Sequence, residues 1–427
     1  MSKCNSEVFV GTAQLDITPE RGIDLAGFAV RPQPATAVLD PLHARALYLE
    51  HGSEQLLWIQ ADILGFDQAL ADRLRAWGQV ELGIPAPRIW LTATHTHSGP
   101  ATIALTGCGA LQPAYVARLE DRICHAARLA RDTTEPCRLI ESHGQCRLGI
   151  DRRGFASAHT DPHVAAFAWQ RSDGTIKAAL LDYAMHPVCL RGSWISADWP
   201  GETARVISDS LPGHPVTIVG SGACGNINPP QVGVAPEQMR DWGASVAHSV
   251  LPGLLRDSRM PPASGDGAFR VLTARIDLPL DHWSSGELDA HKASCLADLS
   301  GSQAFGYKFR LALEAWHDMM SRRLQRGEPP TTRLELGALA LGQSAILTVN
   351  AEVFSKFTAL ADPGVVPHIA TVGCTNGMIG YLPTTDACDE GGYEVKWAML
   401  FYNLPRPRRG GLELAARTAR KLLGSIF

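Results

Sequence analysis

His95 and His97 are separated by a single residue, in the sequence Thr-His-Thr-His-Ser-Gly-Pro at positions 94–100. The apolar run 88–94 that leads into them predicts a β-strand. If the extended backbone continues past Thr94, the two histidine side chains point to the same side. Two imidazoles at a strand end can share one site, with one as a metal ligand and the other as an acid, a base or a hydrogen-bond donor. The pair taken alone favours a simpler interpretation, which is a surface pair or a hydrogen-bonded structural pair.

Three further residues with suitable chemistry stand after or beside apolar runs. His186 follows the strand-like run 175–184, and Glu352 follows the run 345–351. A carboxylate at the end of so apolar a strand needs a partner if it is buried. Tyr381 stands in the segment 376–385. Each has a structural alternative: a packing histidine, a solvated strand terminus and a core tyrosine.

Several well-known hydrolase motifs are absent. The zinc metalloprotease motif H-E-x-x-H does not occur, and His97 is not followed by the x-Asp-His of metallo-β-lactamase-like folds. A serine hydrolase using Ser221 or Ser98 is disfavoured, because the sequence before Ser221 lacks the first glycine of G-x-S-x-G. The histidine pair therefore points to none of these families.

The order of these motifs resembles another family. The sequence His-Thr-His-Ser-Gly-Pro at 95–100 is similar to the histidine motif of the neutral/alkaline, non-lysosomal ceramidases. The partners follow in the same order: a strand-end histidine, a glutamate after an apolar strand, and Gly-Tyr followed by Thr-Thr. The segments 11–19 and 25–29 resemble the family's opening strand and the sequence that follows it. The resemblance covers nearly the whole chain, strongly at the motifs and weakly between them, and it implies the family's N-terminal catalytic domain.

The resemblance implies specific roles. It implies a zinc ion held by four residues: His95, His186, Glu352 and Tyr381. It also implies three residues beside the substrate: His97, Tyr393 and Arg152. For Arg152 the match is partial, since Asp151 stands where the family has an asparagine.

Two departures from the family pattern limit the substrate. The family carries a serine in a Gly-Asp-Val-Ser-Pro-Asn segment, whereas positions 225–230 read Gly-Asn-Ile-Asn-Pro-Pro, with Asn228 at the serine position. Asparagine forms hydrogen bonds but cannot act as a nucleophile, so a covalent serine mechanism is excluded at this position and zinc-water chemistry is not. We also expect the family's C-terminal β-sandwich to be lacking. Both departures favour a small soluble substrate over ceramide.

These observations predict a zinc-dependent hydrolase that cleaves the carbon–nitrogen bond of a linear amide with a zinc-activated water. His97 is expected to carry protons, Tyr393 to stabilise the oxyanion and Asn228 to hold the scissile group or a neighbouring polar substituent. Two alternatives stay open: a zinc esterase or lactonase, and a catalytically degenerate zinc-binding protein of the same fold. Asp62 or Asp198 is a candidate to orient a ligand histidine, with a turn or cap carboxylate as the alternative.

The composition restricts the partners and the location. With 39 Lys and Arg against 43 Asp and Glu, the net charge is −4, which gives no reason to expect nucleic acid or an anionic membrane as partner. No run approaches the ~18 apolar residues of a membrane span, and no apolar leader segment begins the sequence. The 10 cysteines lack any C-x-x-C pair. We therefore expect a cytoplasmic protein without membrane insertion, which could form a homo-oligomer.

Strand and helix patterns alternate along the chain, which predicts an α/β protein with a mixed sheet and helices packed on it. We expect a single catalytic domain over 1–427, with a linker candidate at 257–267. The expected strands cover 8–17, 55–62, 88–94, 175–184, 216–219, 269–278, 333–341 and 344–350. The expected helices cover 67–82, 112–131, 236–251, 286–299, 305–326 and 411–423. The candidate residues stand just after strands, where ligands bind in open α/β sheets.

Overall fold

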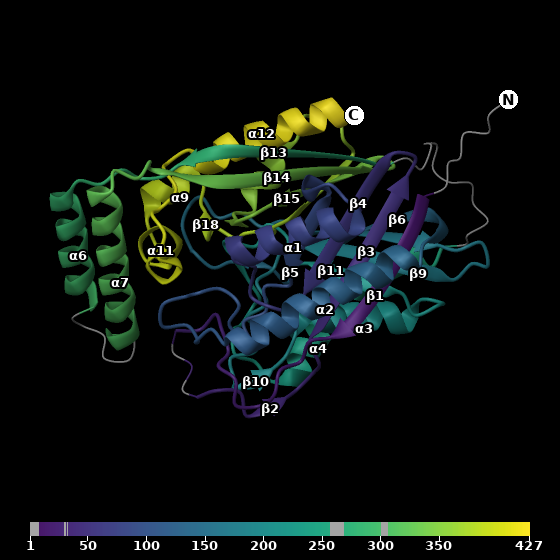
Figure 1. Ribbon diagram of the computed structural model, residues 1–427, viewed down its shortest axis with the longest axis horizontal. Coiled ribbons are helices and arrows are strands. Elements are labelled where there is room, and N and C mark those ends of the chain that lie inside the picture. The colour runs from purple at the N-terminus through teal and green to yellow at the C-terminus, as the bar shows by residue number, and fades with distance from the viewer. Residues whose placement is uncertain (1–7, 30, 32, 257–268, 300–305) are drawn as a thin grey trace.

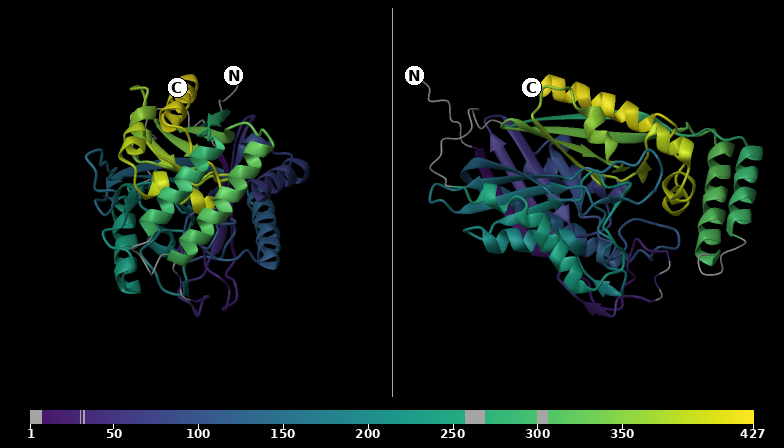
Figure 2. Two further views of the ribbon diagram at one scale, coloured as in Figure 1. Left: turned by 90° about the vertical axis from the view of Figure 1, so that its left-hand side faces the viewer. Right: turned by 180° about the vertical axis from the view of Figure 1, so that it is seen from behind.

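The computed structural model describes residues 8–29, 31, 33–256, 269–299 and 306–427. Two β-sheets pack against each other, and helices cover their outer faces (Figures 1 and 2). This arrangement confirms the mixed α/β fold that the sequence predicts. The linker expected at 257–267 lies outside the described residues.

The larger sheet has the strand order β11-β9-β8-β6-β1-β3-β4-β5 in the described part of the chain. Its strands are β1 (Val8–Asp16), β3 (His43–His51), β4 (Glu54–Ala61), β5 (Ile89–Ala93), β6 (Glu135–Gln145), β8 (His163–Gln170), β9 (Ile176–Tyr183) and β11 (Val216–Gly220). The outer pairs β4–β5 and β9–β11 are parallel, and the inner pairs are antiparallel. Helices α1 (Gln68–Leu82) and α3 (Asp198–Ser210) make the crossovers that parallel pairs require.

The larger sheet consists of two four-stranded halves with a short connection. Strands β1 and β6 pair only through Val8–Val10 and Glu135–Cys137. The halves also meet at Gln60 on β4, whose side-chain amide exchanges two hydrogen bonds with the main chain of Val219 on β11, at 2.7 and 3.0 Å. These hydrogen bonds hold the ends of β4 and β11 together, although the two strands lie near opposite ends of the strand order.

The smaller sheet has the order β13-β14-β15-β17, antiparallel except for the last pair. Its strands are β13 (Phe269–Pro279), β14 (Thr331–Leu341), β15 (Ser344–Val349) and β17 (His368–Val372). Three two-residue ladders complete the strand pairing: β2 (Ala37–Val38) with β10 (Trp194–Ile195), β7 (Ile150–Asp151) with β12 (Ile227–Asn228), and β16 (Glu352–Val353) with β18 (Tyr381–Leu382).

Apolar helix faces cover the outside of both sheets. On the larger sheet lie α1, α2 (Pro113–Asp132), α3, α4 (Pro236–His248) and α5 (Leu251–Leu254). On the smaller sheet lie α8 (Lys356–Ala361), α9 (Thr385–Glu390) and α12 (Gly411–Ile426). Helices α6 (Ser285–Leu299), α7 (Gly306–Gln325) and α11 (Ala398–Tyr402) lie at one end of the molecule (Figure 1). Helix α10 (Tyr393–Lys396) directly precedes α11 along the chain, and η1 (Ala86–Arg88) precedes β5.

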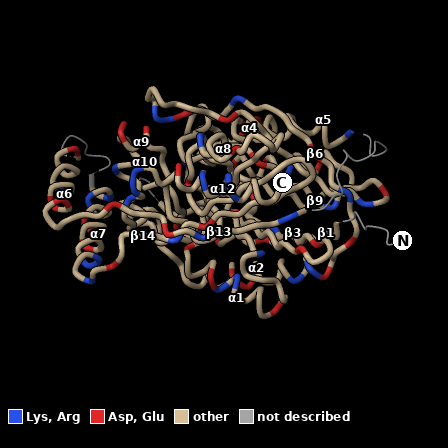
Figure 3. Tube along the Cα trace, turned by 90° about the horizontal axis from the view of Figure 1, so that it is seen from above, with Lys and Arg blue, Asp and Glu red and all other residues tan. Residues whose placement is uncertain are grey.

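Most predicted elements are confirmed, with one clear difference. The helix predicted over 236–251 ends at His248, and a separate helix, α5, begins at Leu251. Pro252 explains the break, because a proline is tolerated in the first turn of a helix but not in its interior. None of the described helices is long and apolar enough to cross a membrane. Basic and acidic residues are interspersed along the chain (Figure 3).

The two sheets approach each other closely at Gly337 of β14. The ring of Trp90, from β5, packs edge-on against Trp58 with 5.3 Å between ring centroids, and both are buried. A methyl group on Gly337 would lie 2.6 Å from the Trp90 ring and 2.4 Å from the Thr348 hydroxyl. The absence of a side chain at 337 therefore sets the spacing of the sheets at this point.

We predict that Gly337→Ala lowers the free energy of unfolding by about 1–3 kcal/mol, because the added methyl overfills the core between the sheets. The measurement is denaturant unfolding with the m-value fitted. Gly424→Ala is the matched control, since Gly424 lies exposed on α12 and an added Cβ would meet nothing within 4 Å beyond its own helix. The control should gain roughly 0.5–1 kcal/mol from helix propensity. Equal stability of Gly337→Ala and the unmodified protein would contradict the account.

Candidate functional site

Four buried side chains converge from both sheets. His95 follows β5 and His186 follows β9, on the two halves of the larger sheet. Glu352 begins β16 just after β15 of the smaller sheet, and Tyr381 begins β18. Glu352 and Tyr381 are direct partners in the parallel β16–β18 ladder. The structure thus brings together all four residues for which the family resemblance implies a metal.

One oxygen of Glu352 lies at the centre of this group. Glu352 Oε2 is 3.3 Å from His95 Nε2 and 3.0 Å from His186 Nε2. The Tyr381 hydroxyl is 3.5 Å from His186 Nε2. His95 Nε2 makes no hydrogen bond of acceptable geometry, although it is buried. A buried ring nitrogen without a hydrogen-bond partner indicates a binding site for a ligand such as a metal ion.

Main-chain carbonyls fix the orientation of both histidine rings. His95 Nδ1 lies 2.7 Å from the oxygen of Leu64, and His186 Nδ1 lies 2.6 Å from the oxygen of Cys224. Since a carbonyl only accepts, each Nδ1 carries a proton, and each Nε2 faces the group, where it can bind a metal once that metal has displaced its own proton. This is the arrangement that metal-binding histidines usually have.

The orienting role considered for Asp62 or Asp198 is therefore filled by main-chain carbonyls instead. Asp62 accepts from the His43 amide and from Arg45, both at 2.8 Å. Asp198 accepts from the amides of Leu190 and Trp199. Asp62 therefore ties the end of β4 to the start of β3, and Asp198 accepts from main-chain amides at the start of α3 and in the loop before it.

The spacing of the donor atoms fits a zinc ion. Two nitrogen or oxygen ligands at ~2.0–2.1 Å from a tetrahedral zinc lie about 3.3–3.4 Å apart. The three donor separations here, 3.0, 3.3 and 3.5 Å, bracket that value. Two imidazoles, a carboxylate and a phenol are oxygen and nitrogen donors that zinc accepts. The residues present therefore fit the metal that the resemblance implies.

The charges of the group also suit a cation. Burial acts to raise the pKa of Glu352, but His95 and His186 outweigh it and hold the pKa well below its usual range. The carboxylate is therefore ionised at neutral pH. Burial raises the pKa of the Tyr381 hydroxyl well above its usual range, against the opposing effect of Arg152.

His97 reaches the same space by a different backbone path from the one expected. Strand β5 ends at Ala93, and His95 has a left-handed backbone with φ 64°. The extended continuation past Thr94 is therefore wrong, yet the rings of His95 and His97 still lie only 5.1 Å apart. The turn at His95 makes this possible.

The surroundings of His97 hold its main chain and leave its ring free. The amide of His97 donates to the main-chain oxygen of Pro187 at 3.2 Å, and the Arg31 guanidinium donates to the main-chain oxygen of His97. A side chain on Gly27 would come within 2.4 Å of the ring, and Phe28 packs against it at 5.1 Å. Both ring nitrogens lack hydrogen-bond partners. Burial lowers the pKa of His97 well below its usual range, and His95 and His186 add to this.

Arg152 connects the remaining predicted residues. The β7–β12 ladder sets Asn228 opposite Ile150 and so brings Arg152 beside it. Arg152 donates to Asn228 Oδ1 and to the Tyr381 hydroxyl, both at 3.1 Å, and to Glu394 at 2.7 Å. Because the Oδ1 of Asn228 is engaged, its NH₂ group is left to donate to a ligand. Tyr393 is 42% exposed, and its ring lies 6.1 Å from that of Tyr381.

Tyr402 is a site residue that sequence reasoning missed. Its hydroxyl donates to Glu352 Oε1, the oxygen that the histidines do not contact. The residue lies in α11 within an apolar run and carries no sequence signal of its role. By contrast, Ser98 and Ser221 have buried hydroxyls without any hydrogen-bond partner, so neither is paired with a histidine base.

We predict that His95→Ala binds one zinc ion per chain fewer than the unmodified protein, because the site then keeps only three of its four protein donors. Metal analysis after dialysis measures this. His125→Ala, which removes an exposed histidine on α2, is the control and should keep the full zinc content. Full zinc content in the His95→Ala protein would refute the ligand assignment.

Comparison with known proteins supports the fold. No protein-family model matches the chain, and no curated protein sequence matches it. Among solved structures, neutral ceramidase from Pseudomonas aeruginosa matches with a TM-score of 0.70 at 16% identity, covering 98% of this chain and 75% of that one. A ceramidase complexed with C2 matches with a TM-score of 0.72 at 15% identity, covering 98% and 76%. The chain therefore has the fold of these ceramidases.

Proposed function

We propose that this protein is a zinc-dependent hydrolase that cleaves the carbon–nitrogen bond of a small amide. The observation that carries the proposal is the group of donor atoms around Glu352 Oε2, 3.0 and 3.3 Å from two correctly oriented imidazoles, beside a third histidine with free ring nitrogens. When bound, zinc supplies Lewis acidity that activates water and polarises a carbonyl group.

The proposed reaction assigns a role to each neighbouring side chain. His97 takes a proton from the attacking water as the oxygen bonds to the carbonyl carbon. The same imidazole then returns that proton to the nitrogen, so that the amine leaves neutral and an acid remains. Tyr393 donates a hydrogen bond to the developing oxyanion.

Arg152 and Asn228 form the proposed substrate-positioning pair. Arg152 holds the amide of Asn228 by its oxygen, so the NH₂ group is available to a substrate carbonyl or hydroxyl. An asparagine here binds without reacting, which supports a direct attack by water over a covalent intermediate. An amide is favoured as substrate because the solved structures that share the fold are ceramidases, and ceramide is an amide.

We predict that His97→Gln lowers kcat by about 10²–10⁴-fold, because proton transfer is lost. Its zinc content should stay unchanged, which separates a proton carrier from a ligand. Steady-state hydrolysis of N-acyl amines together with metal analysis tests both parts. His125→Gln is the control. An unchanged kcat would exclude His97 as the proton carrier, and a loss of zinc would make it a ligand.

A substrate panel distinguishes the proposal from its alternatives. The zinc-loaded protein is assayed on matched N-acyl amines, esters and lactones. Faster turnover of the amides supports the proposal, and faster turnover of esters or lactones would make the protein an esterase or lactonase. Zinc binding without turnover of any acyl substrate would identify a binding protein of this fold.

A further inference from the structure

A second group of three histidines lies away from the candidate site. His143 on β6, His163 on β8 and His368 on β17 have ligand atoms that all lie within 4.8 Å of one another. Strands β6 and β8 belong to one half of the larger sheet, whereas β17 is the edge strand of the smaller sheet. The group therefore lies where the two sheets meet, and it shares no residue with the site around Glu352.

The two histidines on the larger sheet already have the spacing of two ligands. His143 pairs with Ala165 in the β6–β8 ladder, so His143 and His163 share a face of the sheet. His143 Nδ1 and His163 Nε2 share a hydrogen bond at 3.2 Å, a separation close to the ~3.3–3.4 Å between two nitrogen ligands of a tetrahedral zinc, so a bound ion would take the place of the shared proton. Their rings are nearly parallel, with an interplanar angle of 12°.

The other nitrogen of His143 has a hydrogen-bonding system of its own. His143 Nε2 lies 3.4 Å from the Ser344 hydroxyl and 3.8 Å from Glu141 Oε2. Ser344 in turn donates to that oxygen of Glu141 at 2.6 Å. A carboxylate on the far side of a histidine fixes the tautomer that leaves the near nitrogen free for a metal. The carboxylate also offsets the charge of a cation.

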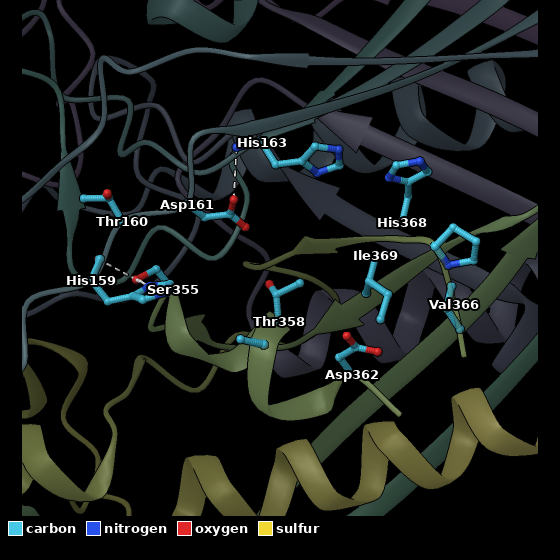
Figure 4. Close-up of a pocket in the computed structure, with 12 residues that line it drawn as sticks. His159, Thr160, Asp161, His163, Ser355, Thr358, Asp362, Val366, His368 and Ile369 are labelled. Carbon is cyan, nitrogen blue, oxygen red and sulfur yellow. Dashed lines mark hydrogen bonds between the residues drawn. The ribbon is translucent and has the colours of Figure 1, made fainter. Parts of the chain in front are cut away.

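His368 is the exposed member of the group and lies at the start of β17. Its ring stacks on that of His143 with 3.8 Å between centroids. One ring nitrogen of His368 lies within 4.8 Å of the ligand atoms of the other two histidines. His163 and His368 also line a cavity of about 310 Å³, in which Figure 4 shows their rings next to each other. The cavity gives an ion a route from solvent.

We propose that His143, His163 and His368 form a second zinc site, which ties β17 of the smaller sheet to β6 and β8 of the larger one. Three imidazoles select zinc and similar transition metals over calcium or magnesium, which require oxygen ligands. The ligands come from strands of both sheets, so the ion acts as a clamp between them. A metal that binds only the folded chain stabilises it.

Zinc titration of the full chain carrying His95→Ala isolates this site. In that background the metal-free protein is expected to take up one zinc per chain and to gain thermal stability on adding it. Adding His163→Gln is expected to abolish both the uptake and the rise in Tm. His125→Gln in the same background is the control and should change neither.

His368→Gln provides the second variant, because an exposed side chain can be replaced without loss of the fold. It is expected to weaken zinc uptake at least tenfold, and circular dichroism checks that the variant is folded. If the His95→Ala protein does not fold, His368→Gln is made in the otherwise unmodified chain, where it should lower the zinc content from two ions per chain to one. The proposal is overturned if the His95→Ala protein binds no zinc, or if zinc uptake survives both His163→Gln and His368→Gln.

Discussion

Glu352 places an ionised carboxylate in the interior, at the end of an apolar strand, with 1% of its surface exposed. Removing such a charge from water costs several kcal/mol unless partners compensate for it. The compensation comes from His95 and His186 on one side and from the Tyr402 hydroxyl on the other. The same arrangement is the one that a divalent cation would require. The carboxylate and its partners are thus both an electrostatic cost in the core and its proposed functional centre.

The need to bring these partners together explains much of the architecture. The histidines belong to opposite halves of the larger sheet, and the carboxylate belongs to the smaller sheet. Only the close packing of the two sheets lets all three meet, and Gly337 is one place where that packing leaves no room for a side chain. Gly27 likewise leaves room for the ring of His97, because a Cβ at position 27 would overlap with that ring. At both positions the glycine matters because a larger residue would not fit.

The local elements could be predicted from sequence, because apolar periodicity reports which face of a helix or strand is buried. Among the longer elements, strands β3, β6, β8 and β17 and helix α3 were not predicted; for β8 the reason is that its Ala-rich run is buried on both faces and shows no alternation. The candidate ligands could be named only through the family resemblance. Each of them, considered by itself, favoured or equally allowed a structural role.

The remaining parts of the site depend on long-range packing. Tyr402 lies in an apolar helix, and the carbonyls of Leu64 and Cys224 carry no side-chain signal. The left-handed turn at His95 also escaped prediction, because a non-glycine residue adopts it only where its surroundings compensate for the strain. The second histidine group joins three strands that are distant in sequence, so nothing in the spacing of its members reveals it.

The most direct test of the central claim is anomalous X-ray diffraction from crystals of the zinc-loaded full chain, measured above and below the zinc absorption edge. The account predicts a zinc peak about 2.0–2.2 Å from His95 Nε2, His186 Nε2 and a Glu352 oxygen, with the Tyr381 hydroxyl as the fourth protein donor. Zinc bound at full occupancy elsewhere, with no peak among these atoms, would contradict it.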